Sequence, residues 1–183
     1  SSAASDVYKR QVEPVVMQPL RRKWVNLQKD VAEWLEQREQ KKTERTKKNI
    51  NARIEKAILA FADHLGSVRV LDPACGSGNF LYVTIQQLLE LEKEVRAFAA
   101  RPEIGVTFTQ RINPAQVHGI EINDYAAELA RVSIWIGYLQ WLHANADATS
   151  RRPILDPLET IECRDAILAF ADGEGNPIPR WEE

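Results

Sequence analysis

The run Val68-Arg69-Val70-Leu71-Asp72-Pro73-Ala74-Cys75-Gly76-Ser77-Gly78-Asn79-Phe80-Leu81 decides how the rest of the chain is interpreted. A short apolar segment rich in β-branched residues ends at an acid, two glycines follow one residue apart, and an apolar helix-forming segment comes next. This order predicts a strand, a tight loop and a helix. Glycines let such a loop bring its backbone close to a ligand, and the N–H groups of the following helix point to the same place. We therefore expect a ligand-binding turn.

Composition excludes several classes of protein. The chain has 183 residues, of which 44% are hydrophobic, and a formal net charge of −2. These values favour one domain plus an appendage over wholesale disorder, and give no global electrostatic reason for a nucleic-acid partner. The two cysteines, Cys75 and Cys163, form neither a disulfide framework nor a metal-binding pattern, and we expect both to be small packing residues. Without a signal peptide or an apolar run of about 20 residues, we expect a cytoplasmic protein without a membrane span.

The first third of the chain is predicted to form a helical arm. Residues 1–11 are small, polar and aperiodic, and we expect them to be disordered or to derive from cloning. Residues 12–66 carry two apolar stripes at steps of three and four, which is typical of amphipathic helices. A polar, basic segment separates the stripes, so the arm is either a hairpin or one long helix. The basic residues in this segment could contact phosphates, or alternatively they form a solvated helix face. They are Lys41, Lys42, Arg45, Lys47 and Lys48.

The remainder alternates strand and helix. Strands are expected at 68–72, 116–121 and 159–163, helices at 79–100 and 125–143, and loops at 101–115 and 145–157, with a turn-rich end from Gly173. This order predicts an α/β fold with a parallel sheet and flanking helices. In such sheets a ligand lies beyond the carboxyl ends of the strands, and an acid follows or ends each strand here: Asp72, Glu121 and Asp165.

The ligand can be narrowed by elimination. A phosphate-binding P-loop needs Lys-Ser/Thr where Asn79-Phe80 stands, and a dinucleotide fold needs a third glycine where Leu81 stands. Glu121 suits ribose hydroxyls, whereas Asp72 would repel a pyrophosphate and suits a cationic group. A nucleoside with ribose and positive charge but no phosphate satisfies these conditions, which points to S-adenosylmethionine.

The segment Asp72–Phe80 (DPACGSGNF) closely resembles the first cofactor motif of adenine-N6 DNA methyltransferases. Together with Gly119–Asn123 and Ala130–Ile136 it resembles the large restriction–modification enzymes of the MmeI-like, Type IIG kind, and Ile161–Ala166 resembles their next motif. The resemblance extends from about Val12 to the end. It implies a partial Rossmann-like class I methyltransferase sheet in residues 67–183, preceded by the helical arm, and a role in methylation of double-stranded DNA by the full-length protein.

The resemblance also implies roles for individual residues. The methionine part of the cofactor would be surrounded by Asp72, Ala74, Cys75, Gly76, Ser77, Gly78, Asn79 and Phe80. Glu121 would hold the ribose hydroxyls, Ile122 would pack on the adenine ring, and Asp165 would accept from the adenine amino group with the Ala166 backbone nearby. Alternatively, Asp72 and Asp165 cap helices or turns and Glu121 is a plain surface carboxylate. No metal ligand is expected.

One motif of the family is missing. Its catalytic Asn/Asp-Pro-Pro-Tyr/Phe does not occur, and Asn176-Pro177-Ile178 lacks the second proline and the aromatic residue. We therefore expect a piece cut before its catalytic residues, which binds cofactor but does not methylate DNA alone, and we assign no catalytic residue. The alternatives are a methyltransferase of protein, RNA or a small molecule, a non-catalytic nucleic-acid-binding module and, more distantly, a nicotinamide enzyme. The sequence leaves open the DNA target, an attached nuclease and the oligomeric state.

Overall fold

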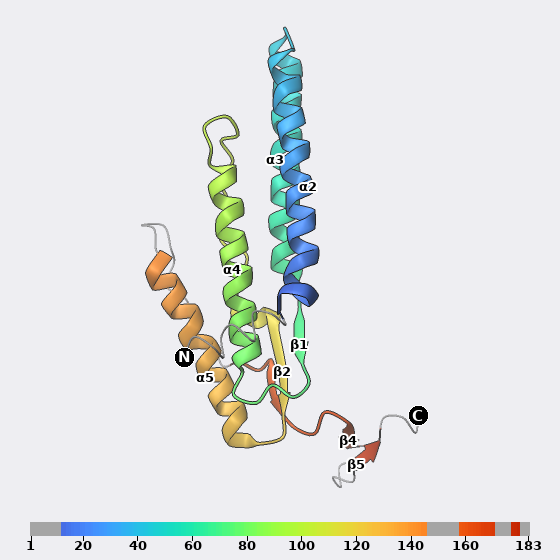
Figure 1. Ribbon diagram of the computed structural model, residues 1–183, viewed down its shortest axis with the longest axis vertical. Helices are drawn as coiled ribbons and strands as arrows, with labels where there is room; N and C mark the ends of the chain where they lie inside the picture. The colour runs from blue at the N-terminus through green and yellow to red at the C-terminus, as the bar shows by residue number, and fades with distance from the viewer. Residues whose placement is uncertain (1–11, 146–157, 171–176, 180–183) are drawn as a thin grey trace. The chain divides into compact units, whose positions relative to one another are not determined.

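The computed structural model of the chain describes residues 12–145, 158–170 and 177–179 (Figure 1). It divides into two compact units, which we call the arm unit and the site unit. The arm unit contains residues 12–68 and 87–113, and the site unit contains 69–86 and the described residues from 114 onward. The boundary thus falls within helix α4 (Asn79–Ala99), after Gln86. Three predicted regions lie wholly or mostly outside the described residues: residues 1–11, the expected loop 145–157 and the turn at Gly173.

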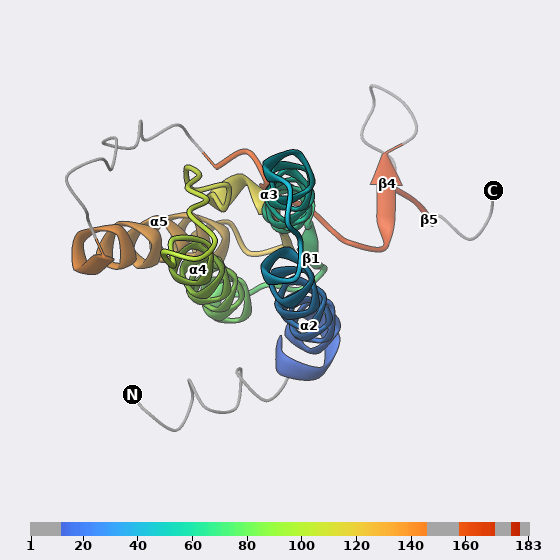
Figure 2. The same cartoon turned by 90° about the horizontal axis from the view of Figure 1, so that it is seen from above.

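The arm unit is built on a helical hairpin. A five-residue π-helix (Glu13–Met17) leads into α2 (Gln18–Glu39), and α3 (Glu44–Ser67) returns alongside it, as Figures 1 and 2 show. The chain reverses at residues 40–43, within the polar segment that separates the two apolar stripes of the sequence. Of the two predicted forms of the arm, the structure therefore has the hairpin.

Trp24 is at the centre of the arm unit. Its ring is 1% exposed, stacks on Phe61 at a centroid distance of 5.5 Å and meets the edge of Phe98 at 5.1 Å. Its indole N–H donates to Glu94 Oε1 at 2.8 Å, which satisfies the polar atom of an otherwise apolar side chain. Trp24 thus joins α2 to α3 and to the second half of α4.

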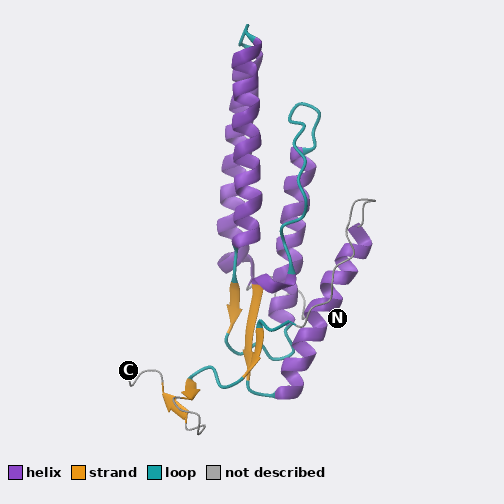
Figure 3. Ribbon diagram, turned by 180° about the vertical axis from the view of Figure 1, so that it is seen from behind, coloured by secondary structure: helices purple, strands orange, loops and turns teal. Residues whose placement is uncertain are grey.

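The site unit is organised by a parallel three-stranded sheet in the order β1-β2-β3 (Figure 3). The strands are β1 (Val70–Asp72), β2 (Val117–Glu121) and β3 (Ile161–Cys163), each starting one or two residues later than predicted. A 3-10 turn (Pro114–Gln116) leads into β2, and α5 (Asp124–Asn145) connects β2 to β3. The first part of α4 runs beside α5 (Figure 1). A Cβ built on Gly137 of α5 would lie 2.0 Å from the Tyr82 ring of α4.

A second, two-stranded antiparallel sheet pairs β4 (Leu168–Phe170) with β5 (Pro177–Pro179). The sequence predicted a turn-rich end from Gly173 onward, where glycines and prolines recur, and it made no prediction for Leu168–Phe170. The three-stranded parallel sheet with its flanking helices confirms the predicted α/β fold, a partial Rossmann-like methyltransferase fold. Among the helices described here, none is both long enough and apolar enough to cross a membrane.

Candidate cofactor site

The three predicted acids lie at the carboxyl ends of the parallel strands, but at different levels. Asp72 ends β1 and pairs in register with Gly119, two residues before Glu121. Glu121 ends β2 and pairs with Cys163, two residues before Asp165. Two residues of a strand correspond to about 6.6 Å. The acids therefore form a staircase across the sheet, with Glu121 about that much further along the strand direction than Asp72.

The glycine loop between β1 and α4 is fixed by backbone hydrogen bonds. The N–H of Cys75 donates to the carbonyl of Ile120 on β2 at 3.0 Å, and the N–H of Gly78 donates back to the Cys75 carbonyl at 2.9 Å. Gly76 and Gly78 both have positive φ, at 52° and 80°, a conformation that L side chains rarely adopt. The sequence pattern that predicted a tight loop here thus corresponds to two left-handed residues.

The two glycines have different surroundings. A Cβ built on Gly76 would have no heavy atom within 4 Å, so the space beside this residue is open. A Cβ on Gly78 would lie 2.9 Å from the Cα of Ala130 on α5, closer than real Cβ atoms approach. Gly76 therefore exposes backbone towards open space, whereas Gly78 lets the loop pack directly on α5.

Glu121 connects the glycine loop to the end of β2. Its Oε2 accepts the N–H of Gly76 at 2.8 Å, and its Oε1 accepts the N–H of Asn123 at 2.9 Å. The bond from Asn123, with smaller contributions from the N–H groups of Gly76 and Ile122, outweighs partial desolvation and lowers the pKa of this carboxyl below its ordinary value. Glu121 is therefore ionised at neutral pH, and two backbone N–H groups hold its carboxylate in place.

Asp72 and Asp165 each accept a hydrogen bond from the backbone two residues further on. Asp72 Oδ1 accepts the N–H of Ala74 at 3.1 Å, and Asp165 Oδ1 accepts the N–H of Ile167 at 2.8 Å. These are Asx turns, the capping role considered as an alternative for both residues. Each of these turn bonds uses one of about four acceptor positions of its carboxylate, so turn capping by itself does not exclude a ligand role.

The other predicted site residues differ in how far they are buried. Cys75 is buried, Gly76, Ser77, Phe80 and Ala166 are half-buried, and Ala74 and Asn79 are exposed. Ile122 is 71% exposed although its side chain is apolar. Two large hydrophobic residues that were not predicted as site residues are also exposed, Tyr125 at 74% and Ile167 at 58%. Each lies within four residues of a strand-end acid, and that proximity is the signal by which they could have been predicted. Exposed apolar side chains next to carboxylates suit a flat, partly polar ligand.

Two further glycines shape the site, and neither was among the predicted site residues. A Cβ on Gly119 of β2 would lie 2.6 Å from the Cys75 sulfur, and one on Gly137 of α5 would lie 2.0 Å from the ring of Tyr82. Gly119 therefore lets the glycine loop pack on the sheet, and Gly137 lets α5 pack against α4. Both contacts join residues far apart in the sequence.

The cysteines differ in environment. Cys75 is buried as expected, but the expectation was wrong for Cys163, which is exposed because the burial of β3 ends after Ile161. Burial, reinforced by the carboxylates of Asp72 and Glu121, raises the pKa of the Cys75 thiol to about 11. At pH 8 Cys75 is therefore almost entirely in the thiol form, and the thiolate is the reactive form.

Iodoacetamide is therefore expected to modify Cys163 and to spare Cys75 in the folded chain at pH 8. Mass spectrometry of the intact chain should find one adduct under native conditions and two in concentrated urea. The Cys163→Ser variant is the control, since it should gain no adduct while folded. Comparable rates at the two cysteines would contradict the described environment of Cys75.

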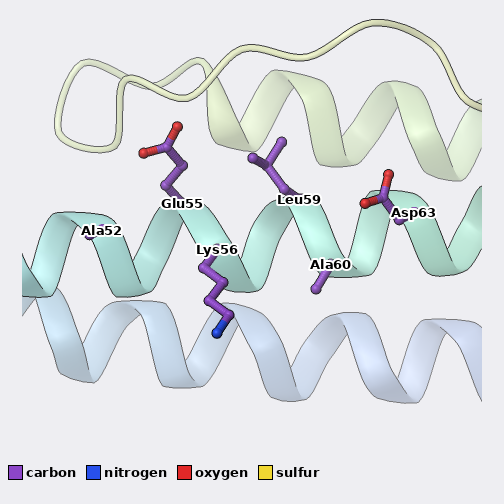
Figure 4. Close-up of a pocket in the computed structure, with 6 residues that line it drawn as sticks. All are labelled: Ala52, Glu55, Lys56, Leu59, Ala60 and Asp63. Atoms are coloured by element: carbon purple, nitrogen blue, oxygen red, sulfur yellow. The ribbon is translucent and has the colours of Figure 1, made fainter.

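A shallow hollow also lies along α3 in the arm unit, lined by Ala52, Glu55, Lys56, Leu59, Ala60 and Asp63 (Figure 4). Figure 4 shows Glu55, Leu59 and Asp63 pointing to one side of α3 and Lys56 to the other, towards α2. Asp63 already pairs with the guanidinium of Arg111 at 2.9 Å. None of the predicted site residues lines this hollow. Within the described ranges, no three His, Cys, Asp or Glu side chains are grouped so that they could hold a metal ion.

Comparison with known proteins relates the site to DNA methyltransferases. The chain is 34% identical over 108 residues to DNA methyltransferase A of Bacillus subtilis, an alignment covering 56% of this chain and 12% of the relative. It is 29% identical over 119 residues to a candidate type II restriction enzyme and methyltransferase of Methanocaldococcus jannaschii, covering 63% and 10%. The chain thus spans about a tenth of the length of the curated relatives it matches.

A solved structure supports the same relationship. The Type IIL restriction-modification enzyme MmeI, determined in complex with DNA, superposes with a TM-score of 0.58 at 25% identity, covering 88% of this chain and 19% of that one. Residues 39–168 match the family described as the DNA-methyltransferase domain of MmeI. This match contains the glycine loop, all three strand-end acids and α5. The chain therefore belongs to the family of MmeI DNA-methyltransferase domains.

Proposed function

We propose that this chain is the cofactor-binding part of a site-specific DNA adenine-N6 methyltransferase and that its site unit binds S-adenosylmethionine. The observation that carries the proposal is Glu121, an ionised carboxylate bonded to the Gly76 N–H of the glycine loop and standing at the carboxyl end of β2. The adenine-N6 specificity depends on the resemblance of Asp72–Phe80 to the first motif of those enzymes. Activity, substrate and the double-stranded DNA partner of a longer protein belong to the same proposal.

The residues present fit the proposed cofactor. Open space beside Gly76 admits a ligand against the loop backbone, where a side chain would obstruct it. The Glu121 carboxylate keeps lone pairs beyond its two backbone bonds, and ribose hydroxyls are donors that such lone pairs accept. Exposed Ile122 offers an apolar surface to a nucleobase, and Asp165 offers an acceptor to an exocyclic amine. When bound, the cofactor would supply an electrophilic methyl group on a sulfonium.

Each group of predicted site residues would then contact one part of the cofactor. Asp72 and the Ala74–Phe80 loop would orient the charged methionine end, and Glu121 would fix the ribose. Ile122, Asp165 and the backbone of Ala166 would hold the adenine. The 183 residues contain no Asn-Pro-Pro-aromatic sequence, so we assign no residue that accepts protons from the target amine.

Calorimetric titration with S-adenosylmethionine tests the site. We expect Glu121→Ala and Asp165→Ala each to weaken binding by about 1.5–3 kcal/mol, roughly 10- to 150-fold, since each removes a charge-assisted hydrogen bond. The matched control is Glu159→Ala, which removes an exposed acid from the amino side of β3 and should leave the affinity unchanged.

Circular dichroism of the three variants would show whether each retains its fold before titration. Parent-like affinity in both Glu121→Ala and Asp165→Ala would remove the site assignment. An equal loss in Glu159→Ala would mean that the titration reports overall charge.

A further inference from the structure

The turn of the helical hairpin carries a concentration of positive charge. We define the basic tip as residues 40–49, which contain five Lys and Arg and one acid, Glu44, whereas the whole chain has 24 Lys and Arg against 26 acids. The tip is therefore strongly cationic although the chain is weakly acidic. The proposed cofactor site leaves this feature unexplained, because the basic residues belong to the arm unit.

Most of these charges are free to meet a partner. Lys47 pairs with Glu44 at 3.3 Å, but the other four basic side chains are exposed and, within the described part of the chain, have no hydrogen-bond or ion-pair partner: Lys41, Lys42, Arg45 and Lys48. Two arginines next to the tip, one on α2 and one on α3, already have partners. Arg38 donates to Asn51 Oδ1 at 2.8 Å and to the Glu103 carbonyl at 2.9 Å. Arg53 lies over the ring of Trp34 at 4.2 Å.

The arrangement works against the stability of the hairpin. Arg45, Lys47 and Lys48 lie in the first turns of α3, where the helix dipole favours acids and disfavours cations. Arg45 and Lys48 are also three residues apart on one helix face, where like charges repel. An anionic partner would offset both effects. The engaged arginines hold α2 and α3 together directly below, so the charges are presented on an ordered support.

We propose that the basic tip binds the phosphate backbone of duplex DNA, independently of base sequence. Lysines and arginines supply such contacts through charge and counterion release, and they fix a protein on the duplex without reading bases. Four unpaired cations within eight residues fit a linear array of phosphates better than a single small anion. The proposal rests on the proposed function for its partner, duplex DNA, and adds the surface that contacts it, which is independent of the cofactor site.

The test compares two triple variants of the complete 183-residue chain. The tip variant carries Lys41→Gln, Lys42→Gln and Lys48→Gln. The matched control carries Arg22→Gln, Lys29→Gln and Lys56→Gln, which removes the same charge from exposed positions elsewhere on the arm. Fluorescence anisotropy with a duplex of arbitrary sequence gives the slope of log affinity against log salt. We expect the tip variant to reduce this slope by about 2.7, near 0.9 for each lost phosphate contact, and the control to change it by less than about 1.

Three further measurements distinguish phosphate binding by the tip from a change in folding or in the cofactor site. A charge-preserving Lys→Arg triple at the same three tip positions should bind like the parent. Thermal melting of the tip variant should occur near the parental temperature, because all three side chains are exposed and the one in α3, Lys48, opposes the dipole of that helix. Calorimetric affinity for S-adenosylmethionine should be unchanged, so failure of the tip and failure of the cofactor site give different results.

Several outcomes would overturn the proposal. These are parental DNA binding by the tip variant, an equal slope change in the control, or a melting temperature that falls in the tip variant alone. Selective loss of binding to vesicles with about 30% phosphatidylserine, with DNA binding intact, would instead assign the tip to an anionic membrane surface.

Discussion

The Gly78→Ala variant is expected to lose about 2–5 kcal/mol of unfolding free energy and, with it, affinity for the proposed cofactor. A φ of 80° costs an alanine about 1–2 kcal/mol, and its Cβ would lie 2.9 Å from the Cα of Ala130. Relieving that contact moves either the loop or α5, which adds roughly 1–3 kcal/mol, as overpacking usually does. Urea unfolding followed by circular dichroism measures the change in stability.

Gly76→Ala is the matched control, because it lies two residues away in the same loop. Its φ of 52° is also positive, but an added Cβ would meet nothing within 4 Å. Its cost in stability should therefore be limited to the backbone term, about 1–2 kcal/mol. Similar losses in the two variants would mean that Ala130 does not limit the position of the loop.

Trp24→Ala should have the largest effect on the arm unit, about 3–5 kcal/mol of unfolding free energy. The substitution empties a fully buried site between Phe61 and Phe98 and leaves the Glu94 carboxylate without its indole donor. Such a loss is a large part of the total stability of an ordinary domain, which is about 5–15 kcal/mol. Thermal and urea unfolding both measure it.

The comparison for Trp24 is Trp34→Ala on the same helix. Trp34 is only half-buried and contacts the guanidinium of Arg53 over its ring at 4.2 Å, so its loss should cost about 1 kcal/mol. A Trp34→Ala variant at least as destabilised as Trp24→Ala would contradict the position of Trp24 as the centre of the arm.

Local patterns were enough to predict the long helices and the three parallel strands, but not the small antiparallel sheet of β4 and β5. The apolar steps of the arm, the glycine pair after Asp72 and the acid at the end of each apolar run are features of adjacent residues. These local patterns could not predict which elements pack against each other. The apolar face of α4 does not reveal that its first part packs on α5 and its second part on the arm, and Pro177 and Pro179 concealed β5 because proline usually excludes a strand.

For the site too, the sequence predicted individual residues but not the contacts between residues far apart in the chain. Asp72, Glu121 and Asp165 could be selected because they end or follow strands. The bond from the Gly76 N–H to Glu121 spans 45 residues and depends on strand register. The closeness of Gly119 to Cys75 and of Gly137 to Tyr82 likewise exists only after folding. Their roles as packing positions depend on contacts between residues far apart in the sequence.

The stepped register of the three strands restricts the shape of any ligand that reaches all three acids. Asp72 and Glu121 differ by two residues along the strands, and Asp165 lies two residues beyond the partner of Glu121. An elongated molecule lying diagonally across the sheet edge follows the step from Asp72 to Glu121. Under the proposed assignment, methionine alone or adenosine alone would span only part of this diagonal, so neither fragment would reproduce the affinity of the intact cofactor.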